Sequence, residues 1–242
     1  MAATGPTAAR VLRQLGHDHR TVGLMLMVPI GILVLLWWIY EGGPTFDVAG
    51  LLVLGLFPLI VNFVVTAVTT LRERESGTLE RLSTLPMGRL DFLLGYAMAF
   101  GVVAIAQTGL AASVTLGLLD LEVAGSAVLV GLIALANALL GMSMGLFVSA
   151  FAANEFQAVQ FLPALVFPQL LLCGLLVPRE EMPDPLPFVS DLLPLSYAVD
   201  ALRAVEQGAM RVADVRTELA VVTGFVVGFL MLGAATLRRR TE

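Results

Sequence analysis

Long apolar runs constrain the fold of this sequence more than any other feature. A transmembrane helix needs about 20 consecutive apolar residues to cross the hydrocarbon core of a bilayer. Only 14% of the residues are charged, whereas soluble domains carry about 25%. We therefore expect an all-α integral membrane protein with one domain, residues 1–242, and six transmembrane helices. The six runs cover residues 23–40, 48–71, 92–119, 125–151, 156–177 and 219–237.

The distribution of arginine predicts which side of the membrane each connection faces. The 14 basic residues are all arginine. Cytoplasmic loops carry an excess of basic residues over outer loops. If the N terminus is cytoplasmic, ten arginines lie in cytoplasmic segments and four lie outside, all four within residues 178–218. We therefore expect both termini to be cytoplasmic.

Two segments outside the apolar runs also have a helical pattern. Residues 1–22 have apolar side chains on one helical face, which predicts an amphipathic helix at the membrane surface. In the outer segment, residues 178–218, a helix is predicted from Ser196 to Met210, and we expect a re-entrant helical pair. The apolar residues that carry these patterns are Val11, Leu12 and Leu15 in the first segment, and Tyr197, Leu202 and Val205 in the second.

The stretch from Arg72 to Asp91 is the only internal segment that is dense in charge. Leu79, Leu82 and Leu85 recur at a helical spacing within it, with charged and polar residues between them. This pattern predicts a short amphipathic helix on the cytoplasmic side, between spans two and three, that docks a partner. The alternative is a solvated loop, which is the commoner structure of a charged stretch.

Polar residues inside the spans are neutral. None of the six runs has an ionisable residue in its central stretch, which argues against a proton- or sodium-coupled carrier. Hydrogen bonding between helices is one role for the neutral side chains, and contact with a transported substrate is the alternative. These residues are Asn62, Thr66 and Thr69 in span two, Asn137 in span four, and Gln157 and Gln160 in span five.

Residues Gly141 to Gly145 match the G-x-S-x-G motif, which raises the alternative of an intramembrane hydrolase with Ser143 as its nucleophile. A serine nucleophile needs a base to take its proton, and the two histidines, His17 and His19, precede span one. Small residues at positions 134, 138, 141 and 145 instead form a stripe that lets helices pack closely. Gly224 and Gly228 form a second small pair, which we interpret in the same way.

Two absences narrow the chemistry further. Without lysine, this sequence has no Walker-type phosphate loop, so ATP-driven work requires another subunit. The single cysteine, Cys173, excludes an intrachain disulfide and a multi-cysteine metal site. We therefore predict no catalytic residue, no metal site and no cofactor in this chain.

Three blocks of sequence resemble the ABC type-2 permeases, the membrane subunits of bacterial and archaeal ABC exporters. The first is RERESGTLERL at residues 72–82, followed by TLP at 84–86 and FLLG at 92–95. The second is LCGLLVP at residues 172–178, with Met182-Pro183 after it. The third is LPLSY at residues 193–197, with ALR at 201–203 and Gly208. Tyr96 and Asp91 stand where the family often has lysine and glutamate.

The resemblance implies a mechanism and partners. Two permease subunits, identical or homologous, would form the path in the bilayer, and two soluble ATPase subunits that hold ATP and magnesium would dock below. The charged helix would be the coupling helix and residues 1–22 the connecting helix. Contacts with the ATPase would come from Gly77, Thr78, Leu79, Glu80, Arg81 and Leu82. Spans two and five would line the path, with Asn62, Thr66, Thr69, Gln157, Gln160 and Phe167 as candidate lining residues.

The cargo implied by the resemblance is a hydrophobic or amphiphilic compound such as a drug, an antibiotic or a lipid-like molecule. Alternatives are a polysaccharide or lipid-linked glycan exporter, the hydrolase that uses Ser143, and a membrane assembly factor without transport. We expect a multi-pass protein of a prokaryotic plasma membrane that binds no nucleic acid.

Overall fold

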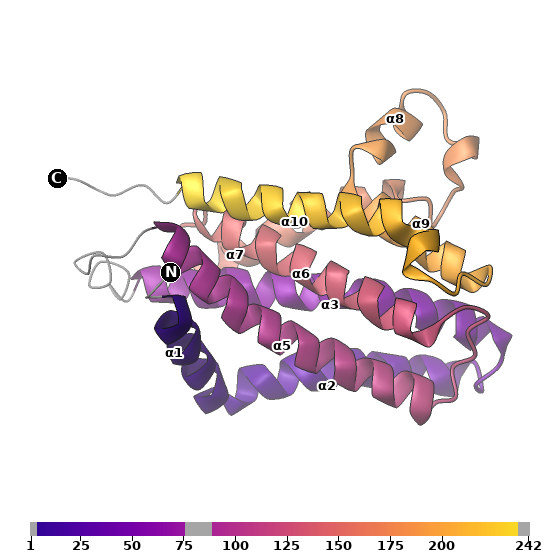
Figure 1. Cartoon of the computed structure of the whole chain (residues 1–242), viewed down its shortest axis with the longest axis horizontal. Helices are drawn as coiled ribbons and strands as arrows, with labels where there is room; N and C mark the ends of the chain where they lie inside the picture. Colours follow the sequence, from indigo (N-terminus) through magenta and orange to yellow (C-terminus); the bar gives the residue numbers. More distant parts are fainter. Residues whose placement is uncertain (1–3, 76–88, 237–242) are drawn as a thin grey trace.

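The computed structural model describes residues 4–75 and 89–236, and every regular element in these ranges is helical. Six helices are long and apolar enough to cross a membrane, which confirms the prediction from the apolar runs. They lie side by side in one bundle (Figure 1). The six are α2 (His19–Ile39), α3 (Pro44–Glu75), α5 (Arg89–Gly117), α6 (Ala127–Ser149), α7 (Glu155–Leu172) and α10 (Arg216–Thr236).

The two ends of the bundle differ. At one end, which we call the loop end, α3 stops at Glu75 and α5 starts at Arg89. Helix α1 (Thr4–His17) lies there, at a steep angle to the six long helices, and α10 ends there too (Figure 1). The opposite end, which we call the far end, carries the α2–α3 turn and the loop between α5 and α6.

Helix α3 continues beyond the apolar run that predicted it. The run covers residues 48–71, but the helix spans Pro44–Glu75 and so includes the first four residues of the charged stretch. Arginine and glutamate are good helix formers, so nothing local stops the helix at Arg72. Helix α7 ends earlier than its run, at Leu172, and Gly174 then adopts a backbone φ of +89°, which glycine takes without strain.

The pair of α3 and α6 is the centre of the bundle. A β-carbon on Gly145 would lie 2.5 Å from the carbonyl oxygen of Phe63, and one on Gly141 would overlap the carbonyl of Leu59. The absence of side chains at these glycines lets the two backbones touch. Small residues at helix interfaces in membranes have this effect generally. The packing role predicted for the small-residue stripe of α6 is therefore confirmed at these two positions.

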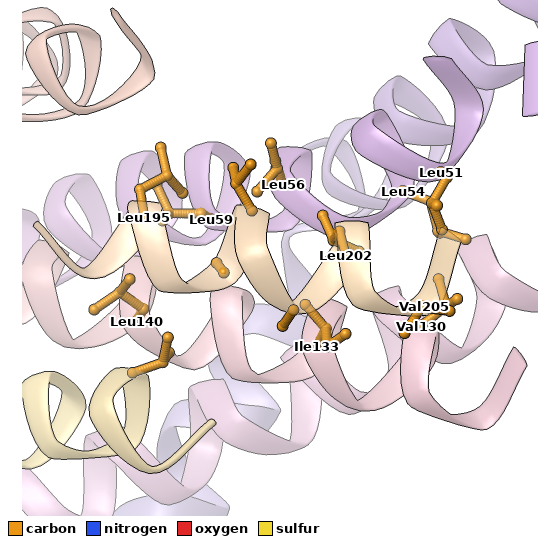
Figure 2. Close-up of a cluster of buried hydrophobic side chains, with 14 of the residues drawn as sticks. Leu51, Leu54, Leu56, Leu59, Val130, Ile133, Leu140, Leu195, Leu202 and Val205 are labelled. Atoms are coloured by element: carbon orange, nitrogen blue, oxygen red, sulfur yellow. The ribbon is translucent and has the colours of Figure 1, made fainter. Parts of the chain in front are cut away.

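The segment of residues 178–218 folds back onto this central pair. Helix α9 (Pro194–Glu206) lies against both α3 and α6, and Figure 2 shows Leu195, Leu202 and Val205 between them. Leu202 and Val205 are fully buried, Tyr197 is half-buried, and Leu202 fills the space above Gly55. The remaining short helices of the described chain are η1 (Arg179–Glu181), α8 (Leu186–Asp191) and η2 (Val212–Val215).

Side chains of residues 178–218 provide hydrogen-bond donors at the end of α7. The last carbonyl groups of a helix have no partner within the helix. The Ser190 hydroxyl donates to the carbonyl oxygen of Leu172 at 2.7 Å, and the Arg203 guanidinium donates to that of Gly174. Residues 178–218 therefore act as a C-terminal cap for α7.

Gly141→Ala should lower the midpoint of thermal unfolding of the detergent-purified protein. The added methyl group collides with the backbone of Leu59, and overpacking of this kind costs roughly 1–3 kcal/mol. Gly224→Ala is the matched control, because nothing lies within 4 Å of a β-carbon at Gly224. Equal midpoints for the two variants would contradict the close approach of α3 and α6.

Candidate functional site at the loop end

Three consecutive charged residues end the apolar part of α3 at the loop end. Arg72, Glu73 and Arg74 lie on a helix of 3.6 residues per turn, so their side chains leave α3 in different directions. Each of them contacts a different part of the chain, as described below. The last turn of α3 is thereby connected to several neighbouring elements at once.

Glu73 connects α3 to α1 and α5. Its side chain is only 3% exposed, and its Oε2 accepts a hydrogen bond from Nη2 of Arg10 at 2.9 Å. The same nitrogen donates to the hydroxyl of Tyr96 on α5 at 2.8 Å, and the Arg10 guanidinium carbon lies 5.9 Å from the centre of the Tyr96 ring. A hydrogen-bonded pair of this kind compensates the cost of burying the carboxylate.

Apolar contacts hold α1 in the position that this ion pair requires. The buried face of α1 packs against the start of α5, where Tyr96 and Phe100 are fully buried. A β-carbon on Gly95 would lie 2.7 Å from the β-carbon of Thr7, so only glycine allows this approach. The face includes Val11 and Leu15, two of the three residues that predicted an amphipathic helix, and Leu12 is half-buried. The apolar face of α1 therefore covers α5.

Arg72 and Arg74 connect α3 to the turn between α6 and α7. Arg72 makes a two-pronged ion pair with Glu155, with Nε to Oε1 at 2.6 Å and Nη2 to Oε2 at 2.8 Å. The guanidinium of Arg74 donates to the carbonyl oxygen of Ser149. Ser149 is the last residue of α6 and Glu155 is the first of α7, so both the cation and the carboxylate also interact favourably with helix dipoles.

The predicted coupling residues, Gly77, Thr78, Leu79, Glu80, Arg81 and Leu82, lie outside the described residues. The structure describes their anchors instead, which are the last turn of α3 and the first turns of α5. A force applied to the 76–88 connection would act first on these two helices, and through the contacts above on α1 and on the α6–α7 turn.

The candidate path residues divide between two environments. Asn62 and Thr66 are fully buried within the bundle, and Thr69 is half-buried. On α7, Gln157 is half-buried, whereas Gln160 is exposed and Phe167 is 52% exposed on the outside of the bundle. Gln160 and Phe167 on α7 therefore lie on the outer surface of the bundle. A role in a substrate path stays a prediction for the residues of α3 and for those of α7.

Two buried amides confirm hydrogen bonding between helices as a role of the neutral polar residues. Asn62 Nδ2 donates to Oε1 of Gln107 on α5 at 2.5 Å, and Asn137 Nδ2 donates to the carbonyl oxygen of Gly55 on α3 at 2.8 Å. Gln107 in turn donates to the carbonyl oxygen of Met25 on α2 at 3.2 Å. That carbonyl has no backbone donor four residues later, because position 29 is proline.

The surroundings of Ser143 do not support a nucleophile. Its side chain is fully buried, and its hydroxyl donates to the carbonyl oxygen of Leu140 at 2.8 Å. His17 and His19 are exposed and bond to backbone carbonyls of α1. Across residues 4–75 and 89–236, no cluster of three or more His, Cys, Asp or Glu side chains could hold a metal ion.

Reasoning from the sequence missed the contacts at the loop end. It placed Arg72 and Arg74 in a partner-binding segment, and it treated Tyr96 only as a departure from a family pattern. The available signal was the position of three charged residues directly after an apolar helix, where burial of the carboxylate requires a cation nearby. That signal could identify Glu73 as needing a partner, but not which arginine supplies it.

Comparison with known proteins gives one family. Residues 7–206 match the model of the family described as ABC-2 type transporter. The chain is 26% identical over 147 residues to the probable multidrug ABC transporter permease YbhS of Escherichia coli, which is 60% of this chain and 39% of the relative. It is also 26% identical over 165 residues to the probable multidrug ABC transporter permease YbhR of the same organism, which is 67% of this chain and 45% of the relative.

A eukaryotic protein is also similar. Over 141 residues the chain is 26% identical to the ABC transporter G family member 20 of Dictyostelium discoideum, which is 58% of this chain and 19% of the relative. The matched stretches thus span less than half the length of these three relatives.

A double-mutant cycle on Arg10→Gln and Glu73→Gln should give a coupling free energy of about 1–3 kcal/mol, because the carboxylate is buried and charge-paired. Thermal unfolding of the detergent-purified variants measures it. The matched control is the cycle on Arg72→Gln and Glu155→Gln, whose side chains are 56% and 45% exposed and should couple by about 0.2–1 kcal/mol. A smaller coupling for the buried pair than for the exposed pair would refute this assignment.

Proposed function

Because this chain belongs to the ABC-2 type transporter family, we propose that it is the transmembrane permease subunit of an ATP-driven exporter. A family of transport permeases supplies the path through the membrane. The proposal adds that separate ATPase subunits bind ATP and magnesium, dock at the loop end, and act on this chain through residues 77–82. In this arrangement the loop end and both termini are cytoplasmic, in a prokaryotic plasma membrane.

The set of contacts at the end of α3 is the observation that carries this proposal. Glu73 pairs with Arg10 of α1, and the same guanidinium bonds to Tyr96 of α5. Arg72 and Arg74 bond to residues on either side of the α6–α7 turn. A rigid displacement of the 76–88 connection would therefore move α1, α5, α6 and α7 together with α3 instead of bending one helix. Transmission by rigid elements with packed contacts is how switching movements are propagated in proteins.

The exposed face of α7 supports a second permease subunit, either a copy of this chain or a homologue. Phe156, Phe167 and Leu171 are 74%, 52% and 58% exposed, and they follow one another at helical spacing with Gln160. In the proposed complex, this face and the equivalent face of the second subunit border the path. Gln160 and Phe167 would then contact the cargo.

The proposed cargo is a hydrophobic or amphiphilic compound. Two observations support this class. The exposed α7 residues are mostly apolar, and the similar permeases YbhS and YbhR carry the description of probable multidrug transporters. Export is the proposed direction, as for an efflux or antibiotic-resistance system.

Leu82→Asp should abolish co-purification of the ATPase subunit from native membranes, because a charge replaces a proposed apolar anchor of the docking helix. The measurement is a tagged pull-down followed by an ATP hydrolysis assay on the eluate. Leu118→Asp is the matched control, since Leu118 is 75% exposed at the far end. The docking site would be refuted if the ATPase co-purified with both variants. It would also be refuted if no ATPase co-purified with the parent chain.

Arg72→Gln combined with Arg74→Gln should leave ATPase binding intact but remove the ATP-dependent movement of the α6–α7 turn. A fluorophore on Ala153→Cys, an exposed position in that turn, in a Cys173→Ser background reports the movement. The control pair is Arg211→Gln and Arg216→Gln, which removes the same charge from exposed sites outside the loop end. An unchanged signal in the Arg72 and Arg74 variant would show that these contacts do not transmit motion.

A further inference from the structure

One face of α2 is exposed along the whole helix. Arg20, Leu24, Met27, Gly31 and Trp38 are all exposed, and their spacing places them within one stripe of the helix. Within the described residues, no other part of the chain covers the apolar side chains of this stripe. In a membrane protein such a face is the one that contacts lipid.

The two ends of this stripe match the thickness of a bilayer. Arg20 and Trp38 are 18 positions apart, which corresponds to about 27 Å along a helix. The hydrocarbon core of a bilayer is about 30 Å thick, and tryptophan favours the interface at its edge. With Trp38 at one interface, Arg20 lies at the level of the headgroups on the other side and faces lipid.

Further basic residues lie at the end of α1 and the start of α2, on either side of the junction that carries Arg20. Arg13 and His17 lie one turn apart on the face of α1 that points away from α5, and His19 opens α2. All of these side chains are exposed. We call Arg13, His17, His19 and Arg20 the basic elbow.

The basic elbow keeps a positive charge that the described chain does not neutralise. Within residues 4–75 and 89–236, neither Arg13 nor Arg20 forms an ion pair, whereas Arg10 pairs with Glu73 and Arg72 with Glu155. The carboxylate within the elbow is Asp18. It accepts hydrogen bonds from the hydroxyl and the backbone N–H of Thr21, which lower the pKa of Asp18, and the charge of Arg72 lowers this pKa further. The elbow therefore carries one carboxylate and two arginines.

We infer that the basic elbow binds the phosphate of anionic phospholipid headgroups in the bilayer around the loop end. Two observations favour this occupant. The positive charge of the elbow complements an anionic phosphate, and the apolar stripe of α2 that begins next to Arg20 complements the acyl chains of the same lipid. Each arginine near an anionic membrane surface strengthens binding about fivefold. The inference requires only that the chain spans a bilayer, so it can be tested independently of the proposed coupling to an ATPase.

Arg13→Gln combined with Arg20→Gln should weaken binding of the first phosphatidylglycerol by about 30-fold, as two arginines are removed. Native mass spectrometry of the detergent-purified full chain measures this affinity beside that for phosphatidylcholine. The parent chain should prefer phosphatidylglycerol, and the variant should bind both lipids equally. Arg13→Lys combined with Arg20→Lys keeps the charge and should keep the preference.

The control pair is Arg211→Gln and Arg216→Gln, which changes the net charge equally outside the elbow and should leave the preference intact. Equal losses for the control and elbow variants would overturn the inference, because net charge would then explain the binding. An elbow variant that keeps its lipid preference but no longer retains an ATPase subunit would also overturn it, and would assign the elbow to that partner.

Discussion

Close contact between α3 and α6 is the interaction on which the other helices depend. Lipid is as apolar as leucine, so membrane helices gain little from burying apolar side chains and associate through close packing and hydrogen bonds. Gly141 and Gly145 supply the first, and the bond from Asn137 to the carbonyl of Gly55 supplies the second. Helix α9 then covers both members of the pair, and α10 packs along α6.

The charged residues at the end of α3 differ in burial, and the kind of partner that each one has differs accordingly. The carboxylate of Glu73 is buried and is matched by a cation from α1, whereas the exposed Arg72 and the half-buried Arg74 bond to helix termini of α7 and α6. The charged stretch of α3 therefore serves two purposes along its length. Its first residues hold the bundle together, and the proposed partner contacts begin only after Glu75.

The sequence predicted the parts of the structure that depend on local pattern. Six apolar runs gave six membrane helices, and the stripe of small residues on α6 gave a close contact. The same pattern at Gly224 and Gly228 has no close neighbour in the described chain, because a stripe does not specify its partner. The pairs of Arg10 with Glu73 and Arg72 with Glu155 join residues 63 and 83 positions apart, and periodicity carries no information at that range.

The bond from Gln107 to the carbonyl of Met25 gives α2 an unusual mechanical property. Pro29 removes one backbone hydrogen bond from the helix, and a side chain of α5 replaces it. The two halves of α2, one carrying Arg20 and the other Trp38, are therefore joined at Pro29 partly by a hydrogen bond that comes from another helix.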